Sequence, residues 1–140
     1  MNLVETKIVK TNDEWKKELS ENVYNICILR GTEAAFSGKY NKHNDLGVYL
    51  CKCCSNQLFS SGHKYDSGSG WPSFYKVIEN DVVEVKEDLS LETMRTEITC
   101  RKCNAHLGHL FYDGPQPTGQ RYCINSLALS FKKSLALYTY

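Results

Sequence analysis

The chain has 140 residues, of which 41% are hydrophobic and 24% are charged, the composition of a single globular domain. Seventeen lysine and arginine side chains nearly balance sixteen aspartate and glutamate side chains, giving a formal net charge of +1. This balance argues against a nucleic-acid partner, because nucleic-acid-binding domains carry a basic excess. No apolar run approaches the ~20 residues of a membrane span, and the first residues lack the apolar core of a secretory signal. We therefore expect a cytoplasmic protein without membrane contact.

Residues 1 to about 45 have the pattern of short helices followed by a connector. Thr11 and Glu14 stand at the spacing of a capping box, which predicts that a helix begins there. Gly31 is the predicted end of a second helix. That helix is indicated by three residues that form an apolar face at helical spacing: Val23, Ile26 and Cys27. Gly, Ser, Asn and Lys are frequent in residues 31–43, which is typical of irregular structure.

From residue 46 the pattern changes to short strands separated by turn residues. Apolar, alternating or β-branched runs predict strands at 47–50, 57–59, 82–85, 94–98, 107–112 and 122–131. Residues 60–70 and 113–119 have the composition of loops. We predict a mainly β fold with short N-terminal helices, its antiparallel sheets packed as a small barrel or tent-like domain. A single domain over 1–140 would then comprise a helical segment and connector to about 45, a β core over 46–131 and a tail over 132–140.

Seven cysteines are the most unusual feature of the composition, and an odd number cannot pair completely. Cys51/Cys54 and Cys100/Cys103 form two C-x-x-C knuckles, which predict one structural Zn²⁺ held by four thiolates. Four-thiolate iron, redox disulfides and buried apolar cysteines are the alternatives. Cys53 competes with Cys54 as a ligand, and the matching spacing of the two knuckles favours Cys54. Such a closed site stabilises the fold and does no chemistry itself.

The residues that remain for chemistry lie near the C-terminus. Cys123 has Arg121 and Asn125 two residues away on either side, so on a strand the three point to one face. A nearby guanidinium lowers the pKa of a thiol and favours the reactive thiolate. His106 and His109 can transfer protons near neutral pH. An inert buried cysteine and histidines with structural or metal-binding roles are the alternatives.

Six segments, in this order, closely resemble the B-type peptide-methionine (R)-S-oxide reductases. The resemblance extends from about Trp15 to Phe131, and no single motif decides it. It rests on the segments 31–40, 51–54 with 100–103, 66–74, 95–97, 106–115 and 121–126.

The resemblance implies that methionine-R-sulfoxide in oxidised proteins and peptides is the substrate. Cys123 would attack the sulfoxide sulfur and end as a sulfenic acid. His109 would protonate the oxygen, with His106 and Asn125 holding the polar end of the substrate. The resemblance also implies three substrate-binding residues: Trp71 against the S-methyl group, Phe111 as a pocket wall, and Arg121.

The sequence departs from a common family pattern where the cysteine is regenerated. Many relatives carry a resolving cysteine at the position of Ser69, so their internal disulfide cannot form here. Cys27 from the N-terminal segment, Cys53 beside the knuckle, or direct reduction by an external thiol remain as routes, with Cys27 slightly favoured. Thioredoxin or a similar thiol is the expected reductant, and a monomer is the expected state.

Three other classes of protein share some of these features. A non-catalytic, zinc-stapled β binding module would need the metal but not Cys123. A nucleic-acid-binding zinc ribbon is disfavoured by the near-zero net charge. A thiol-disulfide oxidoreductase that uses a C-x-x-C pair would hold labile cysteines and no metal.

Overall fold

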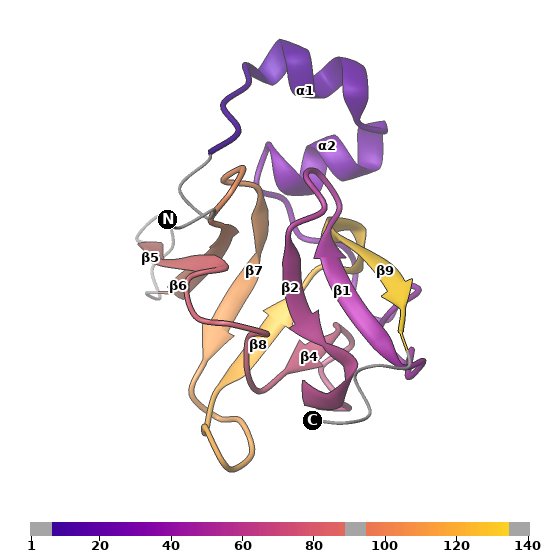
Figure 1. Ribbon diagram of the computed structural model, residues 1–140, viewed down its shortest axis with the longest axis vertical. Coiled ribbons are helices and arrows are strands. Elements are labelled where there is room, and N and C mark those ends of the chain that lie inside the picture. The colour runs from indigo at the N-terminus through magenta and orange to yellow at the C-terminus, as the bar shows by residue number, and fades with distance from the viewer. Residues whose placement is uncertain (1–6, 89–94, 135–140) are drawn as a thin grey trace.

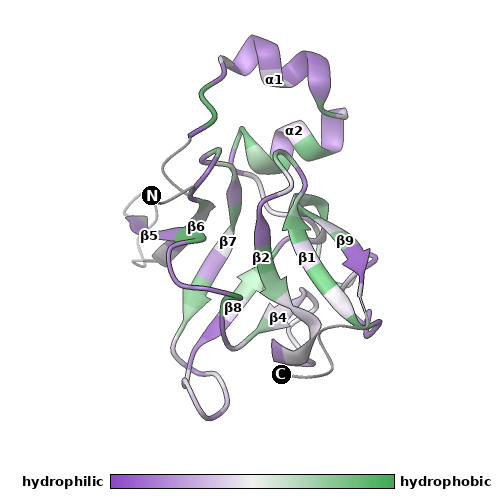
Figure 2. Ribbon diagram, in the orientation of Figure 1, coloured by the Kyte–Doolittle hydropathy of each residue, from purple (hydrophilic) through white to green (hydrophobic). Residues whose placement is uncertain are grey.

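The computed structural model describes residues 7–88 and 95–134, with two short helices at one end of two sheets (Figure 1). Helix α1 spans Asn12–Glu18 and helix α2 spans Glu21–Cys27. The predicted capping box is present: the Glu14 N–H donates to Thr11 Oγ1 at 3.2 Å, and the Thr11 N–H donates to Glu14 Oε1 at 2.9 Å. The predicted apolar face of α2 is buried. Helix α1 is mostly hydrophilic, and Trp15 is its one buried residue (Figure 2).

The end of α2 differs from the prediction. The helix ends at Cys27 with Ile28 as its cap, before the predicted stop at Gly31. Arg30, and not the glycine, takes the left-handed conformation, with φ of 62°. The Arg30 guanidinium forms an ion pair with Glu97 of strand β6, and the Gly31 N–H donates back to the Asn25 carbonyl at 3.0 Å, so a distant and a local contact both hold this turn.

All strand pairs in the described residues are antiparallel, and the strands form two sheets, as the sequence predicts. The three-stranded sheet has the order β2 (Gln57–Ser60), β1 (Gly47–Cys51), β9 (Leu129–Lys133). The six-stranded sheet has the order β3 (Lys64–Tyr65), β4 (Ser73–Phe74), β8 (Arg121–Ile124), β7 (His106–Phe111), β6 (Arg95–Cys100), β5 (Val83–Asp88).

Two predicted segments are divided. The segment predicted as one strand over 122–131 is broken by a 3₁₀ turn, η3, at Ser126–Ala128, so β8 and β9 belong to different sheets. The segment predicted as loop over 60–70 contains a second 3₁₀ turn at Ser61–His63 and the short strand β3. Strand β9 continues to Lys133, two residues past the predicted core, and residues 135–140 of the predicted tail lie outside the described residues.

Aromatic side chains join the two sheets. Phe59 of the smaller sheet stacks on Phe74 of the larger one, with ring centroids 4.2 Å apart, and Tyr49 meets Phe74 at 5.1 Å. Tyr49, Phe59 and Phe74 are fully buried. Among the described residues, no helix is long and apolar enough to cross a membrane.

Candidate active site and metal centre

The two knuckles bring four thiols together between the sheets. The ligand atoms of Cys51, Cys54, Cys100 and Cys103 all lie within 4.8 Å of one another. Two of the sulfur pairs, Cys51–Cys103 and Cys54–Cys100, are 3.6 Å apart. A tetrahedron with Zn–S bonds of 2.3 Å has edges of about 3.8 Å, so the donor set and its spacing fit a four-thiolate metal site.

Each knuckle is the same kind of turn. The N–H of the fourth residue after the first cysteine donates back to that cysteine's carbonyl, from Ser55 to Cys51 at 2.8 Å and from Asn104 to Cys100 at 2.7 Å. Ser55 and Asn104 both have left-handed backbones, with φ of 66° and 65°. The same local turn therefore places the two cysteine sulfurs of each knuckle in the same relative arrangement. Cys53 is half-buried and lies beside this cluster, where it interacts with Cys51 and Cys103.

A separate cavity of about 240 Å³ opens where β7 and β8 meet the loop that carries Trp71. Its lining contains six of the seven residues that we predicted for catalysis and substrate binding: Cys123, His109, Asn125, Trp71, Phe111 and Arg121. Thr32, Ser69 and Gly108 complete the lining. His106 is not part of it and lies behind His109, with its ring centroid 5.4 Å from that of His109.

An irregularity in β7 places both histidines on the same side. Ile98 pairs with Gly108 but Thr99 pairs with His106, so Leu107 is the extra residue of a bulge. In a regular strand, His106 and His109 would face opposite sides of the sheet, and the bulge brings them to the same side. It also leaves the Leu107 carbonyl available to Asn125, whose backbone N–H and side-chain Nδ2 donate to it at 2.9 and 3.1 Å.

Cys123 lies in the centre of this arrangement. It is directly opposite His109 on β7 and Ser73 on β4, and directly opposite residues have Cβ atoms about 4.5–5.5 Å apart. A Cβ at Gly108 would lie 1.9 Å from the Cys123 carbonyl oxygen, so glycine is needed there for the close approach of β8. Cys123 and His109 are thus held opposite each other on adjacent strands.

The electrostatics of Cys123 are balanced between opposing effects. Burial raises the pKa of the Cys123 thiol, while the Arg121 guanidinium and the Ser69 hydroxyl lower it. Arg121 therefore shifts the pKa in the predicted direction. The effect of burial is larger, so the pKa of the Cys123 thiol remains above its ordinary value. The thiol is accordingly the main form near neutral pH, and the thiolate fraction rises with pH.

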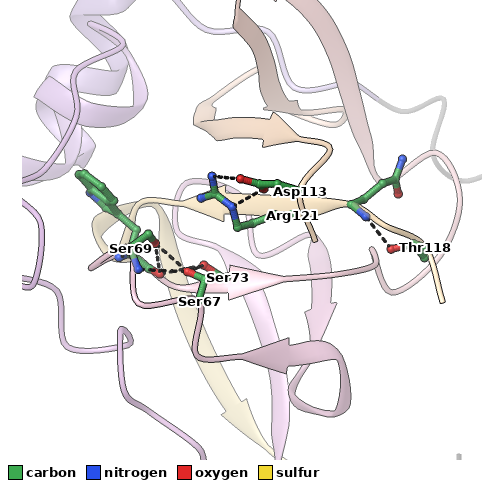
Figure 3. Close-up of polar contacts among 8 residues, drawn as sticks. Ser67, Ser69, Ser73, Asp113, Thr118 and Arg121 are labelled. Atoms are coloured by element: carbon green, nitrogen blue, oxygen red, sulfur yellow. Dashed lines mark hydrogen bonds and ion pairs between the residues drawn. The ribbon is translucent and has the colours of Figure 1, made fainter. Parts of the chain in front are cut away.

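Arg121 is held in position by two contacts. Its Nε and Nη2 atoms donate to Asp113 at 2.8 and 3.2 Å (Figure 3). Its guanidinium lies 4.3 Å from the centre of the Phe111 ring. The charge of Arg121 lowers the pKa of Asp113 in turn. On the adjacent loop, Ser69 accepts a hydrogen bond of 2.8 Å from Ser67, which also bonds Ser73 at 2.7 Å (Figure 3).

Comparison with known proteins identifies the family. The family model of the SelR domain matches residues 19–133. This chain belongs to the SelR domain family. It is 54% identical over 126 residues to a protein from Acinetobacter baylyi named peptide methionine sulfoxide reductase MsrB, covering 90% of this chain and 91% of the relative. A protein of the same name from Pseudomonas syringae is 55% identical over 123 residues, covering 88% and 94%, respectively. One from Acinetobacter baumannii is 52% identical over 126 residues, covering 90% and 91%.

In this SelR domain, Cys27 does not line the Cys123 cavity. Its side chain is 2% exposed, in a helix that packs on β7 and the 3₁₀ turn η3. Cys27 borders a different cavity, of about 410 Å³, between the N-terminal segment and the second knuckle, where Cys103 is its neighbour in the lining. The position of Cys27 therefore gives no support to the prediction that Cys27 is the resolving thiol.

Sequence reasoning missed three acidic residues around the SelR cavity. Glu97 accepts a hydrogen bond of 2.7 Å from His106 Nδ1, and Asp113 anchors Arg121. Glu33 bonds both Asn125 and Trp71 through its main chain. Glu33 stood in one of the segments that carry the family resemblance, but nothing in its local sequence indicated a role. Asp113 lies in the segment 113–119, whose composition predicts only a loop.

Proposed function

We propose that this protein reduces methionine-R-sulfoxide in oxidised proteins and peptides to methionine, with Cys123 as the nucleophile. The observation that carries the proposal is the single cavity that holds a cysteine, a histidine directly opposite it, an amide and two aromatic walls. The names of the relatives supply the substrate class, a peptide methionine sulfoxide. The protein is accordingly an oxidoreductase that repairs oxidative damage.

The reaction transfers two electrons from the Cys123 sulfur to the sulfoxide. The thiolate attacks the sulfoxide sulfur while the oxygen accepts a proton, and the sulfur–oxygen bond of the substrate breaks. The oxygen takes up a second proton and departs as water; water then attacks the Cys123 sulfur, the bond between the two sulfurs breaks, and methionine leaves. Cys123 remains as the sulfenic acid. Trp71 and Phe111 contact the apolar methyl end of the substrate, and the Asn125 amide stabilises the oxygen as its charge grows.

His109 is the proton donor because it lines the cavity opposite Cys123. His106 is a positioning residue: it is 2% exposed, and its Nδ1 donates to the Glu97 carboxylate, which only accepts hydrogen bonds when ionised. This revises the sequence prediction that His106 contacts the polar end of the substrate.

Replacement of His109 by asparagine tests the proton donor. We expect His109→Asn to lower kcat/KM for a methionine sulfoxide peptide by a factor on the order of 10² to 10³, because protonation of the oxygen loses its donor. Steady-state rates between pH 5.5 and 9 check this, and unchanged turnover across that range would reject the assignment.

The proposed route of regeneration is direct attack of an external thiol, such as thioredoxin, on the Cys123 sulfenic acid. The attack forms a mixed disulfide and water, and a second thiol of the reductant then releases Cys123. Ser69 occupies the side of the cavity nearest the thiol, where it cannot form a disulfide. Cys27 and Cys53 both lie outside the cavity lining.

Removal of Cys27 distinguishes these routes. We expect Cys27→Ser to retain turnover with thioredoxin and with dithiothreitol within about twofold of the wild type, since a buried thiol that borders another cavity takes no part. Cys53→Ser is the matched control and should behave in the same way. Loss of thioredoxin-driven turnover in Cys27→Ser, with dithiothreitol-driven turnover retained, would make Cys27 the resolving cysteine.

The four knuckle cysteines are proposed to hold one structural Zn²⁺. When bound, the ion supplies a closed tetrahedral cross-link between the two sheets and no reactive position. Cys51 ends β1 of the smaller sheet and Cys54 lies in the turn after it, whereas Cys100 ends β6 of the larger sheet and Cys103 lies in the turn after it. The protein is further proposed to act in the cytoplasm as a monomer without a nucleic-acid partner.

A further inference from the structure

Glu33 connects three parts of the cavity wall from a connector without secondary structure. Its backbone N–H donates to Asn125 Oδ1 at 3.0 Å, and its carbonyl accepts from Trp71 Nε1 at 3.0 Å. Its side-chain Oε1 accepts from the backbone N–H of Leu127 at 2.9 Å, in the 3₁₀ turn that follows Cys123 and Asn125. One residue therefore fixes the proposed oxygen-binding amide, the aromatic wall and the turn after the nucleophile.

The side chain of Glu33 is a buried charge that packing alone does not explain. The residue is only 6% exposed, and within the described residues its Oε2 atom is buried without a hydrogen-bond partner. A Cβ at Gly38 would come within 2.5 Å of this oxygen, so the backbone of Gly38 closes over it. A buried carboxylate with an unsatisfied oxygen is costly, and such groups are found where a site needs them.

The negative charge of Glu33 opposes the effect of the Arg121 cation on Cys123. It raises the pKa of the Cys123 thiol, whereas Arg121 on the same strand lowers it. The other titratable groups around the thiol are His109 on β7 and Tyr65 on β3. Glu33 is thus the nearby carboxylate whose charge opposes thiolate formation before substrate binds.

We propose that Glu33 is a positioning residue, which holds Trp71, Asn125 and the turn after Cys123 in one arrangement and places a buried negative charge near the nucleophile. The inference rests on the proposed role of Cys123. The charge adds to the effect of burial in favouring the protonated thiol, and the hydrogen bonds keep the pocket assembled for the sulfoxide. Loss of the charge and loss of the hydrogen bonds should therefore have different consequences.

The experiment measures the rate of Cys123 alkylation by iodoacetamide as a function of pH. After digestion with trypsin, peptide 122–132 contains Cys123 as its only cysteine, so mass spectrometry follows this thiol separately from the other six. Glu33→Gln keeps an oxygen acceptor for the Leu127 N–H and removes the charge. We expect the pH midpoint of alkylation to fall by about half a unit, because the charge acts through space without direct contact.

Further variants make the result decisive. Arg121→Gln should move the midpoint upward; because it removes the cleavage site before Tyr122, its Cys123 is followed in peptide 103–132, where fragment ions separate Cys123 from Cys103. The exposed Glu79→Gln should leave the midpoint unchanged. Glu33→Ala, which also loses the acceptor, should lower the midpoint and raise KM for a methionine sulfoxide peptide more than it lowers kcat. If Glu33→Gln does not fold, Glu33→Asp retains the charge on a shorter side chain, and the wild-type midpoint with a raised KM is then expected.

The proposal is overturned if Glu33→Gln leaves the midpoint where it is in Glu79→Gln while Arg121→Gln moves it. A raised midpoint in Glu33→Gln overturns it as well. Because alkylation requires no reductase activity, a folded protein that reduces no sulfoxide would still report on Glu33. Failure of the proposed function and failure of this inference are therefore distinguishable.

Discussion

Cys123→Ser is expected to reduce turnover of a methionine sulfoxide peptide by a factor on the order of 10³ or more, to the rate of the reductant alone. A serine hydroxyl remains protonated at neutral pH and attacks sulfur poorly, whereas the thiolate is an intrinsically strong nucleophile. Turnover in the presence of dithiothreitol checks the loss. Trapping with dimedone, detected on peptide 122–132, should find sulfenic acid in the wild type after substrate is added.

Cys53→Ser is the matched control for this variant, since Cys53 is also half-buried but lies outside the cavity. It should retain turnover close to that of the wild type. Metal content and melting temperature should be unchanged in Cys123→Ser, because one sulfur is replaced by a smaller oxygen on a strand that remains fully paired. Substantial turnover in a folded Cys123→Ser protein would remove Cys123 from its role as the nucleophile and assign the reaction to another group.

Removal of the metal is expected to unfold the protein. A structural four-thiolate zinc contributes on the order of 10 kcal/mol to folding, comparable to the whole stability of a typical domain of about 5–15 kcal/mol. Without it, four thiols remain crowded between the sheets. We expect chelation, or Cys100→Ser, to abolish the cooperative thermal transition followed by circular dichroism.

Cys53→Ser again serves as the control, because it removes a thiol from the same knuckle without removing a proposed ligand. It should retain one zinc ion per chain by elemental analysis and a melting temperature within a few degrees of the wild type. A metal-free protein, verified by the same analysis, that melts as the wild type does would contradict the structural role of the site.

The features that could be predicted from the sequence are those that neighbouring residues determine. The capping box at Thr11 and Glu14 and the two knuckles depend on contacts within four or five residues. The alternation of apolar residues likewise indicates strands whose partners need not be known. Mainly β architecture and the four clustered cysteines followed from these local signals.

The features that could not be predicted depend on contacts between distant segments. The break between β8 and β9 is fixed by Asn125 reaching the Leu107 carbonyl, and that carbonyl is available only because β7 bulges. The ion pair of Arg30 with Glu97, just after the end of α2, likewise joins segments that are far apart in the sequence. The position of His106 behind His109 follows from the bulge in β7. The spacing of the two histidines in the sequence does not reveal this bulge.

The central claim is tested most directly by turnover of the separated R and S epimers of a peptide-like methionine sulfoxide, with dithiothreitol as reductant. The account predicts that the wild-type protein reduces the R epimer and leaves the S epimer unchanged, because Trp71, Phe111 and Asn125 fix the methyl group and the oxygen relative to the attacking sulfur. Reduction of the S epimer alone, or of neither epimer by folded and metal-loaded protein, would contradict it.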